Sequence, residues 1–170
     1  MGQFAANATW LQAAMNLSVI QALHDWPFAV WLRSAPLIYP ALEAVHIVAI
    51  AITFGSLWLV DLRLLGVRLG AMAMIDTRAL AGAALPWTLI GFSLAAAAGS
   101  LMFLARAGDF IGNSAFLIKI LLLFVAATNA GILHSRGPLD ARSKATRLQA
   151  GFSLLIWIAI IICGRWIAYV

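Results

Sequence analysis

The stretch from Pro36 to Gly66, PLIYPALEAVHIVAIAITFGSLWLVDLRLLG, decides how this chain folds. It is long enough to cross a bilayer as a single helix, which requires about 20 predominantly apolar residues. It nevertheless carries Glu43, His46 and Asp61 among side chains that are almost all apolar. Ionisable groups at membrane depth are costly, so they generally face the interior of a helix bundle or a water-filled cavity and mark function.

The polar residues of this stretch share one side of the predicted helix. At about 100° per residue, six side chains fall within one face: Glu43, His46, Ile50, Phe54, Leu57 and Asp61. We expect this face to contact protein rather than lipid.

The composition of the whole chain indicates an integral membrane protein. Of its 170 residues 64% are hydrophobic and only 10% are charged, whereas about a quarter of the residues in a soluble domain are charged. The net charge of +5 comes from basic residues in short segments between apolar runs, which is typical of membrane topology. No nucleic-acid-binding motif is present. The single cysteine, Cys163, lies in an apolar run and excludes an internal disulfide.

Four apolar runs have the length of a membrane span, at about residues 37–60, 85–105, 114–133 and 148–168. They predict an all-α fold, an integral membrane four-helix bundle over residues 34–170. Residues 1–33 are more mixed and predict an N-terminal amphipathic helix at the membrane interface. Pro86 suits the first turn of the second span, and the preceding segment predicts a short surface helix that starts near Asp76.

The distribution of Lys and Arg predicts the orientation in the membrane. The loops after the first and third spans carry Arg63, Arg68, Arg78, Arg136, Arg142, Lys144 and Arg147, and the opposite side carries Arg33, Arg106 and Arg165. Cytoplasmic loops are enriched in basic residues. We therefore expect a multi-pass protein of the bacterial inner membrane with both termini on the periplasmic side.

This orientation places several polar residues at one depth. His46 precedes Arg63 by 17 positions, or about 25 Å along a helix, so it lies in the outer half of the bilayer. Lys119 lies near the outer end of the third span. Glu43, Met102 and Arg106 approach the same level, which predicts an outer pocket. His134 lies beside Arg136 at the cytoplasmic end, so His46 and His134 cannot ligate one haem iron within a protomer.

Three interpretations of the outer pocket remain open. In the first, Glu43 and Lys119 form a buried ion pair that fixes helix register, with His46 hydrogen-bonded beside it. In the second, His46 is an axial ligand or proton carrier of a redox site, and Lys119 holds an anionic group such as a haem propionate. In the third, His46, Met102 and Cys163 bind copper, because thioether and thiolate ligands suit Cu(I).

Other residues of the spans predict packing. Gly91, Ala95 and Gly99 recur every fourth residue, a spacing that lets helices approach closely in lipid. Asn129 is expected to hydrogen-bond across helices. Asp61 is expected to pair with an arginine at the level of the lipid head groups, and His134 to be solvated.

The motif PxxExxH, formed here by Pro40, Glu43 and His46, is followed by Gly55 and the DLRLLG segment. In these features the chain resembles uncharacterised bacterial four-span inner-membrane proteins and, more distantly, HemJ-type protoporphyrinogen oxidases and CopD-type copper-resistance proteins. The HemJ-type proteins also have a lysine in the third span, matched here by Lys119. The resemblance implies a membrane helical bundle with a b-type haem on His46 and an important Lys119 beside it.

Together these features predict a membrane protein that binds a redox cofactor, haem b, near the outer face through His46, Lys119, Glu43 and Arg106. It would act in electron transfer, exchanging electrons with quinone or a periplasmic redox partner. The alternatives are a copper-handling protein with His46 and Met102 as ligands, and a structural or assembly subunit of a membrane complex. Four spans enclose little volume, so we expect a homo-oligomer or a subunit of a larger complex.

Overall fold

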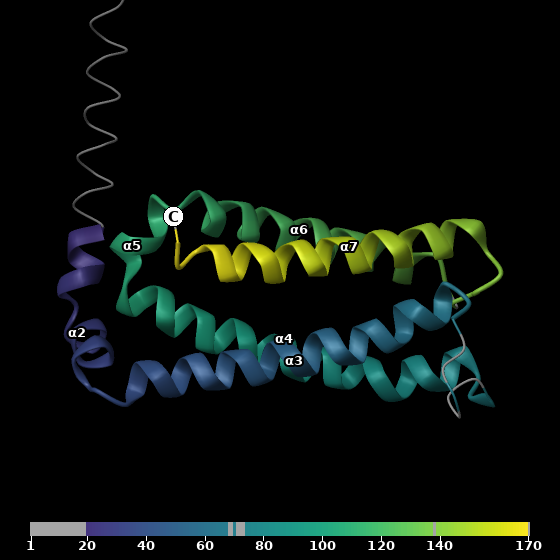
Figure 1. Ribbon diagram of the computed structural model, residues 1–170, viewed down its shortest axis with the longest axis horizontal. Helices are drawn as coiled ribbons and strands as arrows, with labels where there is room; N and C mark the ends of the chain where they lie inside the picture. Colours follow the sequence, from purple (N-terminus) through teal and green to yellow (C-terminus); the bar gives the residue numbers. More distant parts are fainter. Residues whose placement is uncertain (1–19, 68–69, 71–73, 138, 170) are drawn as a thin grey trace, which may run out of the picture.

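The computed structural model describes residues 20–67, 70, 74–137 and 139–169, and no β-strand occurs within them. Four long helices run side by side along the longest axis of the molecule, namely α3 (Ile38–Leu64), α4 (Thr77–Ala105), α6 (Ser114–Ser135) and α7 (Lys144–Trp166) (Figure 1). The short helices α2 (Pro27–Ser34) and α5 (Ala107–Ile111) lie at one end, and the C-terminal ends of α3 and α6 lie at the other. The predicted all-α four-helix bundle is confirmed.

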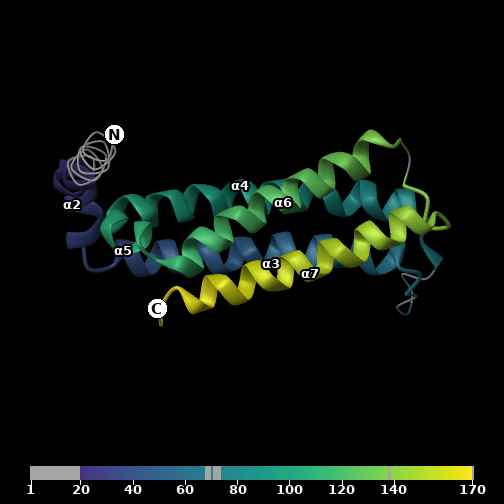
Figure 2. The ribbon, with the colours of Figure 1, turned by 90° about the horizontal axis from the view of Figure 1, so that it is seen from above.

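The bundle consists of two helical hairpins. α3 packs on α4 and α6 packs on α7, and the hairpins are joined by contacts between α3 and α7. Figure 2 shows the α6–α7 pair lying over the α3–α4 pair. Each of the four long helices is apolar and long enough to cross a membrane. Large apolar side chains such as Leu89, Phe124 and Leu155 are exposed along them, as a lipid-facing surface requires.

The helix that contains the second predicted span begins before that span. α4 starts at Thr77 and continues without a break to Ala105, so the surface helix expected near Asp76 is continuous with the helix of the span. Asp76 caps it by accepting hydrogen bonds from the backbone N–H groups of Arg78 and Ala79. Pro86 lies inside the helix rather than in its first turn. Membrane helices tolerate such a proline because neighbouring groups satisfy the freed carbonyl.

Small residues hold α3 against α4. Gly91, Ala95 and Ala98 of α4 are buried, and so are Ala49 and Thr53 of α3. A Cβ atom at Gly91 would lie 2.7 Å from Thr53 Oγ1 and 2.9 Å from the Ala49 carbonyl oxygen. The two backbones therefore meet where only glycine fits, as expected for close packing in lipid.

The buried face of α3 differs from the predicted one. Its buried residues are Ala49, Thr53, Val60, Asp61 and Leu64. Glu43 is exposed, and His46, Ile50, Phe54 and Leu57 are only half-buried. The side of α3 that contacts α4 is therefore the side that carries its small residues, Ala49 and Thr53. This occurs because lipid is as apolar as a protein core, so close packing rather than hydrophobicity selects the interface.

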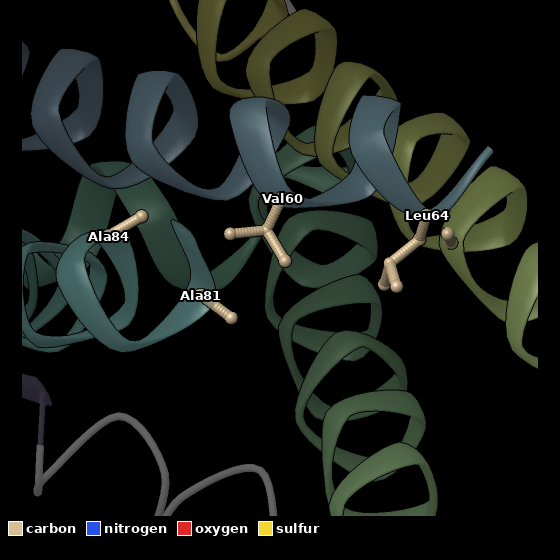
Figure 3. Close-up of a cluster of buried hydrophobic side chains, with 5 residues drawn as sticks. Val60, Leu64, Ala81 and Ala84 are labelled. Carbon is tan, nitrogen blue, oxygen red and sulfur yellow. The ribbon is translucent and has the colours of Figure 1, made fainter. Parts of the chain in front are cut away.

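A hydrophobic cluster closes the bundle near the C-terminal end of α3. Val60 and Leu64 pack there against Ala81 and Ala84 of α4 (Figure 3) and against Ala150 of α7. Arg147 of α7 donates a hydrogen bond of 2.9 Å to the carbonyl oxygen of Leu65, the C-cap residue of α3. α3, α4 and α7 are therefore bound together at this end of the bundle.

The opposite end is joined through polar and aromatic contacts. The Asn113 side chain accepts a hydrogen bond from Phe116 N at the start of α6 and donates one of 3.0 Å to the carbonyl oxygen of Ile167 after α7. Phe103 of α4 stacks on Phe116 of α6, with their ring centroids 5.5 Å apart. These contacts set the level at which α4, α6 and α7 meet.

The described part of the N-terminal segment is helical and lies across this end of the bundle (Figure 1). Ala29 and Leu32 of α2 are buried, whereas Trp26, Phe28 and Trp31 remain exposed. Such aromatic side chains suit a membrane–water interface. Residues 1–19 of the predicted interfacial helix lie outside the described residues.

Candidate functional site

His46 projects from α3 onto the small-residue surface of α4. Its Nδ1 lies 2.8 Å from the carbonyl oxygen of Ala95. A carbonyl oxygen can only accept a hydrogen bond, so Nδ1 carries the proton and donates it. In a neutral imidazole this leaves the lone pair on Nε2. Metal-ligating histidines have this arrangement, with one ring nitrogen donating to a backbone carbonyl and the other binding the metal.

Gly99 makes room for the His46 ring. A Cβ atom at this position would lie 3.0 Å from Cε1 and 3.4 Å from Nδ1 of His46. The ring therefore lies directly over the backbone of α4, one turn from the carbonyl group that it binds. Gly99, which we predicted as a packing residue, determines the position of the imidazole.

Lys119 occupies a comparable position on the other hairpin. Its side chain extends from α6 across Gly164 of α7, where an added Cβ atom would lie 3.5 Å from Nζ. The ammonium group is close enough to interact electrostatically with His46 and with Cys163. His46 and Lys119 thus each lie against a glycine of the neighbouring helix.

Glu43 does not join this pair. Its side chain is exposed, and the Glu43–Lys119 ion pair of the first interpretation is absent, because His24 and Asp25 form the only ion pair within 4.0 Å among the described residues. Glu43 lies five helical turns before Asp61 and so points to the same side of α3. α7 packs on α3, and the N-terminal end of α3 lies farther from α7 than its C-terminal end does (Figure 1).

Arg106 and Met102 lie nearer the end of the bundle. The Arg106 guanidinium stacks 4.7 Å from the centroid of the Tyr39 ring at the start of α3, a cation–π contact. Arg106 is exposed and is the C-cap residue of α4, and Met102 is half-buried one turn before it. Arg106 thus lies above the His46 level, at the rim of the predicted pocket.

His134 lies at the far end of the bundle from His46. It is exposed near the end of α6, and its Nδ1 donates a 2.9 Å hydrogen bond to the carbonyl oxygen of Ala130 in its own helix. His46 lies near the beginning of α3, which is at the opposite end in Figure 1. The two histidines therefore cannot ligate one iron within a protomer, as we predicted from their depths.

The family of the chain follows from a comparison with family models. A model for DUF6644, described as a family of unknown function, matches residues 36–170 and includes all four long helices. The chain belongs to the DUF6644 family. No curated protein and no solved structure matches this DUF6644 protein. The comparisons thus support the resemblance to an uncharacterised family and show no similarity to HemJ-type or CopD-type proteins.

The described part of this DUF6644 protein contains no group of three or more His, Cys, Asp or Glu side chains that could hold a metal ion. A metal at the level of His46 and Lys119 would therefore depend on His46 together with a sulfur ligand, or on a cofactor that supplies its own ligands. The geometry provides one imidazole nitrogen where α3 packs on α4 and one ammonium group where α6 packs on α7.

The surroundings of Asp61 differ from the predicted ones. Asp61 is 2% exposed. Its carboxyl group lies near the Ser153 hydroxyl of α7, and no arginine of the described residues lies within 4.0 Å of it. The cause is the close approach of α3 and α7 at this level. Sequence reasoning missed Ser153, although it is the only hydroxyl-bearing residue between positions 148 and 168.

Asn129 forms the predicted hydrogen bond between helices. Its Nδ2 donates to the carbonyl oxygen of Gln149 on α7, at 3.2 Å. Arg136 donates to the Oε1 atom of the same Gln149, at 2.9 Å. An open groove of about 260 Å³ runs beside Asn129 and is lined by Phe124, Val125, Thr128, Ile132 and Phe152. These contacts stabilise the α6–α7 hairpin.

Proposed function

We propose that this DUF6644 protein binds a redox cofactor, haem b, between its two hairpins through His46, and that it acts in electron transfer. The observation that carries the proposal is the pairing of two unsatisfied groups at one level. His46 has an Nε2 lone pair that the Nδ1 hydrogen bond leaves available. Lys119 has a half-buried ammonium group without an acidic partner within 4.0 Å among the described residues.

The donor set fits haem b. The imidazole nitrogen is a common axial ligand of haem iron. An ammonium group inside a membrane bundle is costly unless it is paired, and a haem propionate would supply the missing negative charge. When bound, haem supplies one-electron oxidation and reduction. His46 would hold the iron, Lys119 would orient a propionate, and Arg106 at the rim could contact the second propionate.

The proposed orientation places this site near the outer face. The described cations at the C-terminal ends of α3 and α6 and at the start of α7 include Arg63, Arg136, Arg142, Lys144 and Arg147. Basic residues favour the cytoplasmic side, so the opposite end and the chain termini would face the periplasm of a bacterium. Quinone in the bilayer or a periplasmic redox protein would exchange electrons with the cofactor.

Absorption spectroscopy tests the proposal. The protein is purified in mild detergent after expression with a haem precursor, and its spectrum is recorded with and without dithionite. We expect a Soret band in the wild type, loss of that band in His46→Ala, and weaker haem retention in Lys119→Met. His134→Ala is the matched control, because it removes an exposed histidine at the other end of the bundle and should keep the band.

A wild-type protein that neither contains haem nor takes it up on titration would refute the haem proposal. Equal effects of His46→Ala and His134→Ala would refute the assignment of the ligand.

Copper handling is a second candidate, favoured by the position of Cys163 on α7. Cys163 precedes Gly164, the residue against which the Lys119 ammonium group lies, and its thiol is within electrostatic range of Lys119. A Cu(I) ion would take His46, Cys163 and Met102 as ligands, since soft sulfur ligands suit this ion. Metal analysis of the same purified sample distinguishes the candidates. Copper that is lost in Met102→Leu supports this function, and a sample free of copper after incubation with Cu(I) excludes it.

A further inference from the structure

Asp61 is the most deeply buried ionisable group in the described part of the chain. It lies three residues before the end of α3 and is 2% exposed. Its carboxyl group lies near the Ser153 hydroxyl of α7, and its Oδ2 atom has no hydrogen-bond partner in the described residues. Neither the proposed cofactor site nor the packing of the hydrophobic cluster explains why an acid occupies this position.

The cationic side chains near this end of α3 contact groups other than the Asp61 carboxylate. Arg63 on α3 donates to the carbonyl oxygen of Ile75, and Arg147 on α7 donates to that of Leu65. Arg78 at the start of α4 and Lys144 at the start of α7 are exposed. None of these cations lies within 4.0 Å of the Asp61 carboxylate, since the described residues contain one ion pair at that distance, His24–Asp25.

A carboxylate in such surroundings must be neutralised. Burying an unpaired charge is far more costly than burying a hydrogen-bonded neutral group. The hydrophobic cluster at this end of α3 includes Val60 and Leu64, which flank Asp61 in the helix, and Ala150 of α7, all buried and apolar. Metal cations such as Ca²⁺ require about six or more oxygen ligands, whereas the contacts here supply one carboxyl group and one hydroxyl group. The chemistry therefore favours a proton over a metal ion.

The proton has a short route to water. Asp61 lies less than one helical turn from the end of α3, where the exposed Gly66 and Val67 follow. It is 15 residues from His46, or about 22 Å along α3. Proton exchange at Asp61 would thus occur at the end of the bundle opposite the proposed cofactor, and would not require that cofactor.

We propose that Asp61 is an exchangeable proton-binding site within the α3–α7 interface. Binding adds one proton from water to the carboxylate and yields a neutral carboxylic acid whose O–H group can donate a hydrogen bond. Release returns the proton to water at the end of α3 and leaves a charge beside the Ser153 hydroxyl, with no cation of the described residues within 4.0 Å. The protonated state of Asp61 therefore favours close packing of α7 on α3, and the ionised state weakens that packing.

Infrared spectroscopy of the protein in lipid vesicles tests this site directly. A protonated carboxylic acid has a carbonyl stretching band that shifts in D₂O and disappears on ionisation. We expect this band in the wild type, its loss as the pH rises, and its absence in Asp61→Asn at every pH. Asp109→Asn is the control, because Asp109 is an exposed acid of α5 at the other end of the bundle and its removal should leave the band unchanged.

Ser153→Ala provides a second variant that keeps the acid. We expect the band to persist in it but at a higher frequency, because the carboxyl group loses its hydrogen-bonding partner. Far-UV circular dichroism of each variant verifies that the helices are retained. Modification of Asp61 by a hydrophobic carbodiimide, located by mass spectrometry, should occur in the wild type and decline over the pH range in which the band disappears.

Three outcomes would overturn the proposal. The first is a spectrum without an Asp61-dependent acid band at any pH at which the protein stays folded. The second is a band that neither titrates nor shifts in D₂O, which would identify a sealed structural acid. The third is a titration that Na⁺ displaces and choline does not, which would identify a cation site.

Discussion

Replacing Gly91 by alanine tests the close approach of α3 and α4. The added Cβ atom would lie 2.7 Å from Thr53 Oγ1 and 2.9 Å from both Thr53 N and the Ala49 carbonyl oxygen, whereas ordinary contacts of a Cβ atom are 3.4 Å or longer. Two of these three atoms belong to the backbone. The Thr53 hydroxyl is also fixed, because it donates a 2.8 Å hydrogen bond to the Ala49 carbonyl oxygen. The helices must therefore move apart by about 0.5–0.7 Å.

The cost follows from two opposing effects. Overpacking of a well-packed site costs about 3 kcal/mol at the upper end of its usual range. Alanine in place of glycine inside a helix stabilises the helix by about 1 kcal/mol. We therefore expect Gly91→Ala to lower the free energy of unfolding by about 2 kcal/mol, measured by SDS titration in mixed micelles with circular dichroism as the signal.

Gly82→Ala is the matched control, because it lies in the same helix and an added Cβ atom there meets nothing within 4 Å. It should be neutral or more stable by up to about 1 kcal/mol. If Gly91→Ala proved as stable as Gly82→Ala, an added Cβ atom at Gly91 could not lie as close as 2.9 Å to the backbone of α3, and the reasoning would be refuted.

Three further substitutions test neighbouring contacts. Gly99→Ala should displace the His46 imidazole, because the new methyl group would lie 3.0 Å from Cε1; a haem titration should show roughly tenfold weaker binding, equal to about 1.4 kcal/mol. Asp76→Ala removes the acceptor of two backbone N–H groups at the start of α4 and should lower the free energy of unfolding by about 1 kcal/mol in the same SDS titration. Asn129→Ala removes the hydrogen bond to Gln149. It should lower the free energy of unfolding by about 0.6 kcal/mol, a smaller effect than that of Gly91→Ala.

Much of the architecture could be predicted because a bilayer imposes simple lengths on apolar helices. The spans at 37–60, 114–133 and 148–168 coincide with α3, α6 and α7 to within a few residues. The placement of Pro86 in a first turn was wrong, because the surface helix expected near Asp76 and the second span form one helix whose cap lies ten residues before the proline. The helix start near Asp76 was predicted, but the proline suggested a second start.

The orientation of side chains around a span was harder to predict. Every side of α3 is apolar, so the polar residues alone suggested its buried face, and they placed Glu43 there. The small residues Ala49 and Thr53 identify the face that meets α4. Since close packing drives helix association in lipid, the positions of small residues are a better guide to an interface than hydrophobicity.

The candidate site was predicted in part. The shared depth of His46 and Lys119 followed from counting residues along two antiparallel spans, and the structure places them close enough to interact. Their supporting contacts, the Ala95 carbonyl group for His46 and Gly164 for Lys119, could not be predicted. Such contacts depend on the rotation of each helix, which a length argument does not determine.

The position of α3 explains why one helix carries both proposed sites. It is the helix that packs on both α4 and α7 and so joins the hairpins. His46 uses its contact with α4 and Asp61 its contact with α7, about 22 Å apart along the helix. Because α3 is a continuous helix between them, a change in its packing on α7 would also move the surface that positions His46. Recording the proposed Soret band in Asp61→Asn would measure this coupling, and an unchanged band position and reduction potential would show that the two ends act independently.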